Sequence, residues 1–163
     1  MAFSSIAVML MVVYFALGIV AVGGKIDPAM SASDSFSEAN KRYYEMDYDG
    51  AISYYQHAIL LDSENADYYC NYASVLYDLT RIDESESNYL TALQLDGRHT
   101  SSLFNSALLL QDRRKSKEAA MLYMRLLAIE TQNGDAYANL VSYTKQIYTT
   151  DKITVFKKGV VFV

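Results

Sequence analysis

Residues 47–62 read DYDGAISYYQHAILLD and carry the pattern on which the rest of the chain is built. Small residues at Ala51 and Ala58 flank Tyr55 at spacings of four and three, so the three side chains share one face of a helix. Small residues on such a face let a second helix approach closely. The stretch therefore predicts a helix packed against a helical neighbour.

The same residue types return when the sequence is shifted by 34 positions, which defines three units at about residues 32–65, 66–99 and 100–133. Each unit contains two amphipathic stretches separated by a short polar turn, so we expect one helical hairpin per unit. The recurring columns are Ala39, Ala73 and Ala107; Ala51, Ser85 and Ala119; Tyr55, Tyr89 and Tyr123; Ala58, Ala92 and Leu126; and Leu61, Leu95 and Ile129.

This column pattern resembles the tetratricopeptide repeat family over residues 32–133, with a partial fourth unit that begins at Gly134. The resemblance implies an all-α fold in which helix pairs stack into a right-handed α-solenoid. Glu38 stands where the family has a large apolar residue, so we expect the first unit to be frayed or distorted. The proline that usually closes each unit is replaced by Ser63, Gly97 and Thr131.

The repeat domain is predicted to span residues 34–148. Its last part, residues 134–148, predicts a capping helix, because a repeat array needs an element that covers the apolar face of its last unit. Residues 149–163 alternate β-branched and aromatic side chains, so we expect an irregular or strand-like tail. A linker at residues 25–33 joins the domain to residues 1–24, which carry no charged side chain.

Residues 3–22 are long and apolar enough to cross a membrane, since twenty helical residues span about 30 Å, the thickness of the hydrocarbon core. We predict a single-pass membrane helix with the repeats in the cytosol, because Lys25, Lys41 and Arg42 follow the span. The alternative is a cleaved signal peptide ending near Gly23, which would make the repeats lumenal or secreted.

Composition argues against several classes of function. The 19 acidic and 14 basic side chains give a net charge of −5, which disfavours nucleic acid as a partner. Cys70 is the only cysteine and neither histidine has metal-ligand spacing, so we expect no metal and no cofactor. The sequence has no phosphate loop or nucleophile elbow, so we expect no enzymatic activity. The alternative is a piece or accessory part of a membrane-bound glycosyltransferase that carries such repeats.

The resemblance implies that the first helix of each unit lines a concave groove where extended peptides bind. Asn71, Asn105 and Asn139 lie 34 residues apart on these helices, with Ser37 at the equivalent place in the first unit. An amide donates and accepts at once, so this row either bonds the backbone of a bound peptide or bonds a neighbouring helix. Other side chains on the same face, which either form pockets or belong to the core, are Tyr43, Tyr44, Cys70, Tyr77 and Phe104.

Some members of the family hold the C-terminal carboxylates of chaperones with two asparagines and three cationic residues. Asn40 and Asn71 match the asparagines. The cationic places hold Phe36, Ser101 and Asn105, and the missing charges disfavour chaperone tails. We therefore predict a membrane-anchored scaffold that binds another protein or an extended peptide in its groove.

Overall fold

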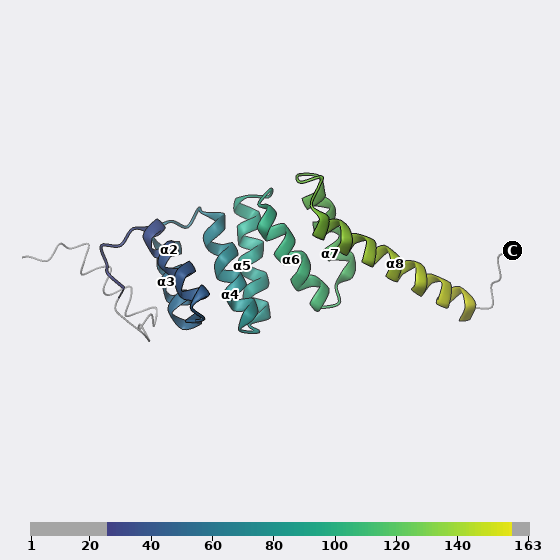
Figure 1. The fold of residues 1–163 in the computed structure, drawn as a ribbon, viewed down its shortest axis with the longest axis horizontal. Helices are drawn as coiled ribbons and strands as arrows, with labels where there is room; N and C mark the ends of the chain where they lie inside the picture. The colour runs from purple at the N-terminus through teal and green to yellow at the C-terminus, as the bar shows by residue number, and fades with distance from the viewer. Residues whose placement is uncertain (1–25, 158–163) are drawn as a thin grey trace, which may run out of the picture. The chain divides into compact units, whose positions relative to one another are not determined.

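The computed structural model describes residues 26–157, which form seven α-helices and no strand (Figure 1). The helices pair in chain order: α2 (Ala32–Tyr44) with α3 (Tyr48–Leu61), α4 (Ala66–Asp78) with α5 (Ile82–Leu95), and α6 (Thr100–Asp112) with α7 (Ser116–Leu127). A last helix, α8 (Gly134–Lys157), packs against α7. The predictions of an all-α fold and of one helical hairpin per unit are confirmed.

The predicted membrane segment, residues 1–24, lies outside the described residues. In the part of the chain that is described, no helix combines the length and the apolar character needed to cross a bilayer. The chain divides into an N-terminal unit, residues 1–95, and a C-terminal unit, residues 96–163.

Small residues at the predicted columns allow the helices of a pair to pack closely. Ala39 and Ala51 have no exposed surface in the N-terminal unit, and neither does Ala107 in the C-terminal unit. Ser85 occupies one of these columns, and its buried hydroxyl donates to the carbonyl oxygen of Ala73 at 2.8 Å. The serine therefore buries a polar atom without leaving it unsatisfied.

Each helix pair turns through a residue in the left-handed backbone region. These residues are Met46, Thr80 and Arg114, with φ angles of 60°, 61° and 59°. In the second pair the N–H of Arg81 donates to the carbonyl of Leu76 at 2.8 Å, which closes the end of α4 as a Schellman motif. Glycine is the usual residue at such a position, because a side chain there costs about 1–2 kcal/mol.

The first unit is ordered, so the expectation that Glu38 leaves it frayed or distorted is wrong. The Ser31 hydroxyl accepts the N–H of Asp34 at 3.1 Å and caps α2. Glu38 pairs with Lys41 at 3.7 Å and with Arg42 at 3.1 Å. Because no described helix precedes α2, a carboxylate in this column remains near cations and water instead of entering a core.

α8 continues to Lys157, so the expected irregular or strand-like tail is wrong for residues 149–157, and the capping helix is longer than predicted. Residues 158–163 lie outside the described part of the chain. No glycine or proline occurs between Asp135 and Lys158 to stop the helix. Extending an existing helix costs little free energy compared with starting one. Each β-branched residue raises the free energy of the helix by only about 0.5 kcal/mol, so the alternating pattern does not stop α8.

Replacing Thr80 by glycine should raise the free energy of unfolding by about 0.5–1 kcal/mol, because a β-branched residue is strained at positive φ and glycine is not. Urea denaturation followed by helical circular dichroism measures the change. The matched control is Thr91→Gly inside α5, which should lower the free energy of unfolding by about 0.5 kcal/mol. A loss of stability in Thr80→Gly would contradict the turn described above.

His57 is a buried side chain of α3 that contacts α2. Its Nδ1 lies 2.6 Å from the hydroxyl of Ser35. That hydroxyl donates to the carbonyl of Ser31 at 2.8 Å, so the imidazole supplies the proton of the Nδ1 bond. Burial lowers the pKa of His57 below its ordinary value, and the fold therefore favours the neutral ring.

The stability that the neutral His57 contributes should be lost on acidification. In the unfolded chain histidine takes up a proton near pH 6.5, whereas the folded chain does so only at lower pH, so stability falls as the pH drops through the interval between the two pKa values. We expect the difference in unfolding free energy between the wild type and His57→Gln to shrink from about pH 7.5 to about pH 5.5. A constant difference in denaturant titrations across that range would refute this role of burial.

Candidate peptide-binding face

The first helices of the two hairpins in the N-terminal unit, α2 and α4, contact each other and share a polar centre at Asn40. The side-chain oxygen of Asn40 accepts the hydroxyl of Tyr55 at 2.6 Å and the amide of Asn71 at 2.9 Å. Three helices thus converge on one oxygen atom. The surface around it, which we call the α2–α4 face, comprises Asn40, Tyr43, Asn71, Ser74 and Asp78.

Tyr43 makes a second link between the two hairpins on this face. Its hydroxyl donates to Asp78 Oδ2 at 2.7 Å. Burial, with a further contribution from the bond to Asp78, raises the pKa of Tyr43 to about 12, so the hydroxyl stays a neutral donor. The Tyr43 ring also packs against Tyr44 and Tyr48, with ring centroids 5.7 Å and 6.0 Å away.

In every unit the buried tyrosine of the second helix has a polar partner on the first helix. In the second unit the hydroxyls of Tyr89 and Ser74 lie 2.9 Å apart, and Ser74 is 34 residues after Asn40. In the third unit that position is Leu108, which has no side-chain acceptor, and the Tyr123 hydroxyl donates to Gln111 at 2.7 Å instead. Each buried ring therefore ends in a hydrogen bond at the surface of the first helix.

Part of the predicted asparagine row is used in hydrogen bonds within the protein. The Asn71 amide donates to Asn40, and the Ser37 hydroxyl donates to the carbonyl of Ser33 in its own helix. The Asn40 amide nitrogen and the Asn71 oxygen take part in no hydrogen bond among the described residues, so one donor and one acceptor are left for other partners. Asn105 and Asn139 are half-buried in the C-terminal unit. A peptide-binding role for this row stays a prediction.

The other candidate residues differ in how much surface they offer. Phe104 is half-buried and meets Tyr123 edge to face at a centroid distance of 5.9 Å, so it extends the core of the C-terminal unit. Tyr77 is also half-buried, whereas Tyr44 is 82% exposed. Cys70 is 1% exposed and cannot line a pocket, which corrects its placement on the groove; a buried thiol behaves as a small apolar side chain.

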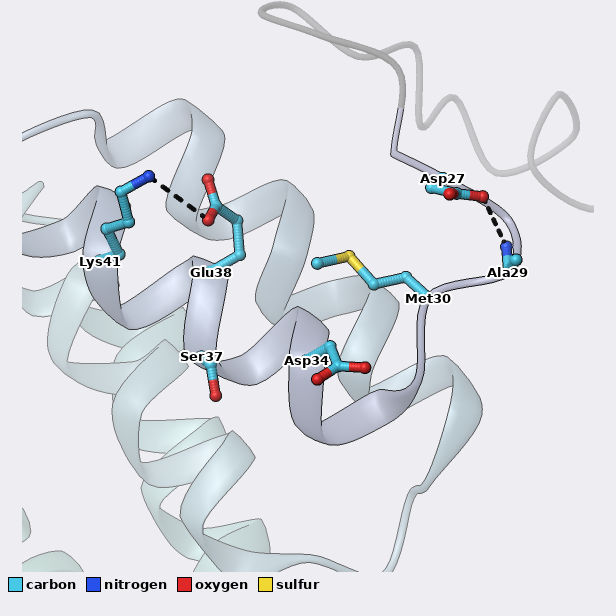
Figure 2. A pocket seen from close by; sticks show the side chains of 7 residues that line it. All are labelled: Asp27, Ala29, Met30, Asp34, Ser37, Glu38 and Lys41. Carbon is cyan, nitrogen blue, oxygen red and sulfur yellow. Dashed lines mark hydrogen bonds and ion pairs between the residues drawn. The ribbon is translucent and has the colours of Figure 1, made fainter.

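A separate open hollow of about 570 Å³ lies beside α2 (Figure 2). The segment before the helix supplies Asp27, Ala29 and Met30, and α2 supplies Asp34, Ser37, Glu38 and Lys41. Glu38 and Lys41 pair across one turn of the helix. Asn40, Tyr43 and Asn71 are not among its lining residues, so the hollow is distinct from the α2–α4 face.

The sequence interpretation missed the polar partners of the tyrosine column and the role of Asp78. A signal was present, since Asn40 and Ser74 each precede their tyrosine by 15 residues. A buried tyrosine hydroxyl needs an acceptor, and the position 15 residues earlier supplies one in two of the three units. No comparable spacing marked Asp78, because its bond to Tyr43 joins different columns of neighbouring hairpins.

Paired helices with small residues at their contacts, repeated every 34 residues, define an α-helical repeat protein. Residues 66–99 match the family model of the tetratricopeptide repeat. The match covers the second unit, and the fold of the other described units agrees with it. The tetratricopeptide repeat family predicted from the sequence is therefore supported.

Solved structures with the same fold include the Arabidopsis OM64 TPR domain, at 24% identity and a TM-score of 0.68, covering 71% of this chain and 96% of that one. The first TPR of Spaghetti (RPAP3), bound to the HSP90 peptide SRMEEVD, is 24% identical with a TM-score of 0.69, and the match covers 72% of this chain and 96% of that one. The second TPR domain of human RPAP3, in complex with the HSP70 peptide SGPTIEEVD, is 24% identical with a TM-score of 0.65, and the match covers 72% of this chain and 98% of that one. Among curated proteins no match is found. At this identity the likeness establishes the fold.

Removing the acceptor from the α2–α4 face should destabilise the N-terminal unit. Asn40→Ala leaves the buried hydroxyl of Tyr55 without its partner, at a cost of about 1–3 kcal/mol in unfolding free energy. Tyr55→Phe removes the hydroxyl itself, so Asn40→Ala should cost less in the Tyr55→Phe background. Denaturant unfolding of the wild type, the two single variants and the double variant measures the coupling free energy between Asn40 and Tyr55. Strictly additive effects would show that their hydrogen bond contributes nothing to stability.

Proposed function

We propose that this protein is a membrane-anchored scaffold that holds an extended segment of a partner protein against the first helices of its repeats. The observation that carries the proposal is the arrangement of Asn40 and Asn71. Their mutual hydrogen bond fixes both amides in place, while the Asn40 nitrogen and the Asn71 oxygen remain unused among the described residues. One fixed donor and one fixed acceptor side by side match the alternating N–H and C=O groups of an extended backbone.

The apolar surroundings of these amides favour the same function. The half-buried ring of Tyr43 lies three residues after Asn40 on α2, Tyr77 is half-buried on α4, and in the C-terminal unit Phe104 and Asn105 are consecutive half-buried residues. A bound segment would bury apolar side chains on the rings while its backbone bonds the amides, which is how binding sites combine affinity with orientation. Fixed amides need no reordering on binding, so little conformational entropy is lost.

The membrane part of the proposal is supported by residues 3–22, which carry no charged side chain over a length that suits a bilayer. Lys25, Lys41 and Arg42 after that stretch favour the cytosolic side for the repeats. The scaffold would then combine a binding face with a fixed location. No catalytic step is part of this function.

Chaperone tails are ligands of related folds, because two structural neighbours are bound to HSP90 and HSP70 peptides. The fold itself is therefore compatible with such ligands, and the prediction against them depends entirely on this chain's side chains. Phe36, Ser101 and Asn105 supply no positive charge. The N-terminal unit has 13 acidic against four basic side chains, so an acidic tail would be repelled. We propose a partner segment without an acidic end.

Proximity labelling from the full-length chain in its own cells tests this function, with protease protection to establish the side of the membrane. Replacing Asn71, Asn105 and Asn139 together by alanine should weaken partner capture about tenfold or more, because each hydrogen bond contributes about 0.5–1.5 kcal/mol. Asn88→Ala on α5 is the matched control and should leave capture unchanged, since its amide bonds the carbonyl of Glu84 in its own helix.

If the triple variant captures its partner as well as the wild type does, with helix content preserved, the asparagines do not bind the partner. The absence of a discrete partner set would refute the scaffold function itself. Recovery of HSP90 or HSP70 through direct contact with the repeats would overturn the exclusion of chaperone tails. Repeats protected from protease together with labelled lumenal proteins would place the binding face on the other side of the membrane.

A further inference from the structure

The outer surface of α7 combines exposed methionines with basic side chains. Met121 and Met124 are 55% and 51% exposed. Lys117 and Arg125 are exposed as well and lie at helical spacing from the methionines, so the four side chains share one side of the helix, with the exposed Glu118 at its edge. We call Lys117, Met121, Met124 and Arg125 the α7 outer face.

The fold does not require this composition, because the other repeats carry different residues at the same positions. The residues of α5 that lie 34 positions earlier are Asp83, Ser87, Leu90 and Thr91. Where α5 has an acidic and a hydroxyl side chain, α7 has Lys117 and Met121. Both helices pack in their hairpins through the same small and tyrosine columns. At the position of Met124 the α5 residue is Leu90, which is also exposed, so the features that α7 adds to the repeat are Met121 and the basic side chains Lys117 and Arg125.

Basic side chains are concentrated in the C-terminal unit and in the turn before α7. The turn before α7 contains Arg113, Arg114 and Lys115, of which Arg114 sits exposed at the left-handed position. The C-terminal unit has ten basic against six acidic side chains, whereas the N-terminal unit has four basic against 13 acidic ones. A chain with a net charge of −5 thus places most of its positive charge in one unit.

We propose that the α7 outer face and the preceding turn dock on an anionic lipid membrane. Phosphate and carboxylate groups of the lipids would pair with Arg114 and Lys117, and with the remaining N–H groups of Arg125, whose Nη2 donates to the carbonyl of Gly97 at 2.9 Å. The flexible, unbranched side chains of Met121 and Met124 would enter the boundary between headgroups and acyl chains, as apolar residues of interfacial helices do. Anionic lipid repels the acidic N-terminal unit, so the attraction is specific to this part of the chain.

A lipid surface fits these observations better than a protein partner does. Basic residues at both ends of a short apolar strip on a single helix suit a fluid surface, which adapts to the strip without a matching shape. The uncharged residues 3–22 are also predicted to hold the chain at a bilayer. Docking then requires only that the C-terminal unit meets the membrane already present. Each basic residue near an anionic leaflet adds about fivefold in affinity.

Oxidation of individual methionines tests the proposal on the full-length chain. The protein is reconstituted with vesicles of phosphatidylcholine alone and with vesicles that contain about one-third phosphatidylserine, and hydroxyl-radical oxidation is read by mass spectrometry. We expect oxidation of Met121 and Met124 to slow about threefold or more with phosphatidylserine, as burial at the interface excludes water. Met46, 75% exposed in the acidic N-terminal unit, is the internal control and should react equally in both.

The variant Arg114→Gln with Lys117→Gln should lose this protection while the Met46 rate and the helical circular dichroism stay unchanged. High salt should reduce the protection in the wild type by screening the charges. Equal oxidation of Met121 in the two kinds of vesicle would overturn the proposal. So would protection that is already present without vesicles and rises with protein concentration, because the face would then bind a second copy of the chain.

This surface is separate from the α2–α4 face, so the two proposals fail independently. Arg114→Gln with Lys117→Gln leaves Asn71, Asn105 and Asn139 intact and should not change partner capture at saturating expression. Unchanged capture by the Asn71, Asn105 and Asn139 triple variant, with methionine protection preserved, would count against the peptide-binding proposal alone.

Discussion

The buried hydroxyl of the tyrosine column is the constraint on which the structure of each repeat depends. Tyr55, Tyr89 and Tyr123 are at most 3% exposed, so their rings fill the space between paired helices. An unsatisfied hydroxyl there would cost about 1–3 kcal/mol, and each one reaches a side chain of the first helix. The column therefore fixes the packing of a hairpin and also places a polar group on its surface.

That coupling links stability to the candidate binding face. Asn40 is at once the acceptor for a core tyrosine and the partner of Asn71 in the next hairpin, so the amides that would meet a ligand are held by the fold. Preorganised polar groups bind without first losing freedom of rotation. The same arrangement limits the face, because part of its hydrogen-bonding capacity is used inside the protein.

The charge distribution gives the two units surfaces of different character. The acidic N-terminal unit carries the Asn40 and Asn71 pair, while the C-terminal unit carries exposed methionines among basic side chains. A common repeat architecture accommodates both, since the columns that pack the helices leave the outer positions free to vary. Different surfaces can therefore serve different partners without any change of fold.

The sequence by itself determined the helical hairpins, the 34-residue repeat and its core columns, because small residues and tyrosines recur wherever two helices meet. It also located the asparagine row, since equal spacing places side chains on equivalent faces. Tertiary structure alone decided that Asn71 bonds Asn40, that Tyr43 reaches Asp78 and that Cys70 is buried. These facts depend on side-chain directions across neighbouring helices. The helical course of residues 149–157 likewise followed from continuation of an existing helix, which a local alternating pattern does not reveal.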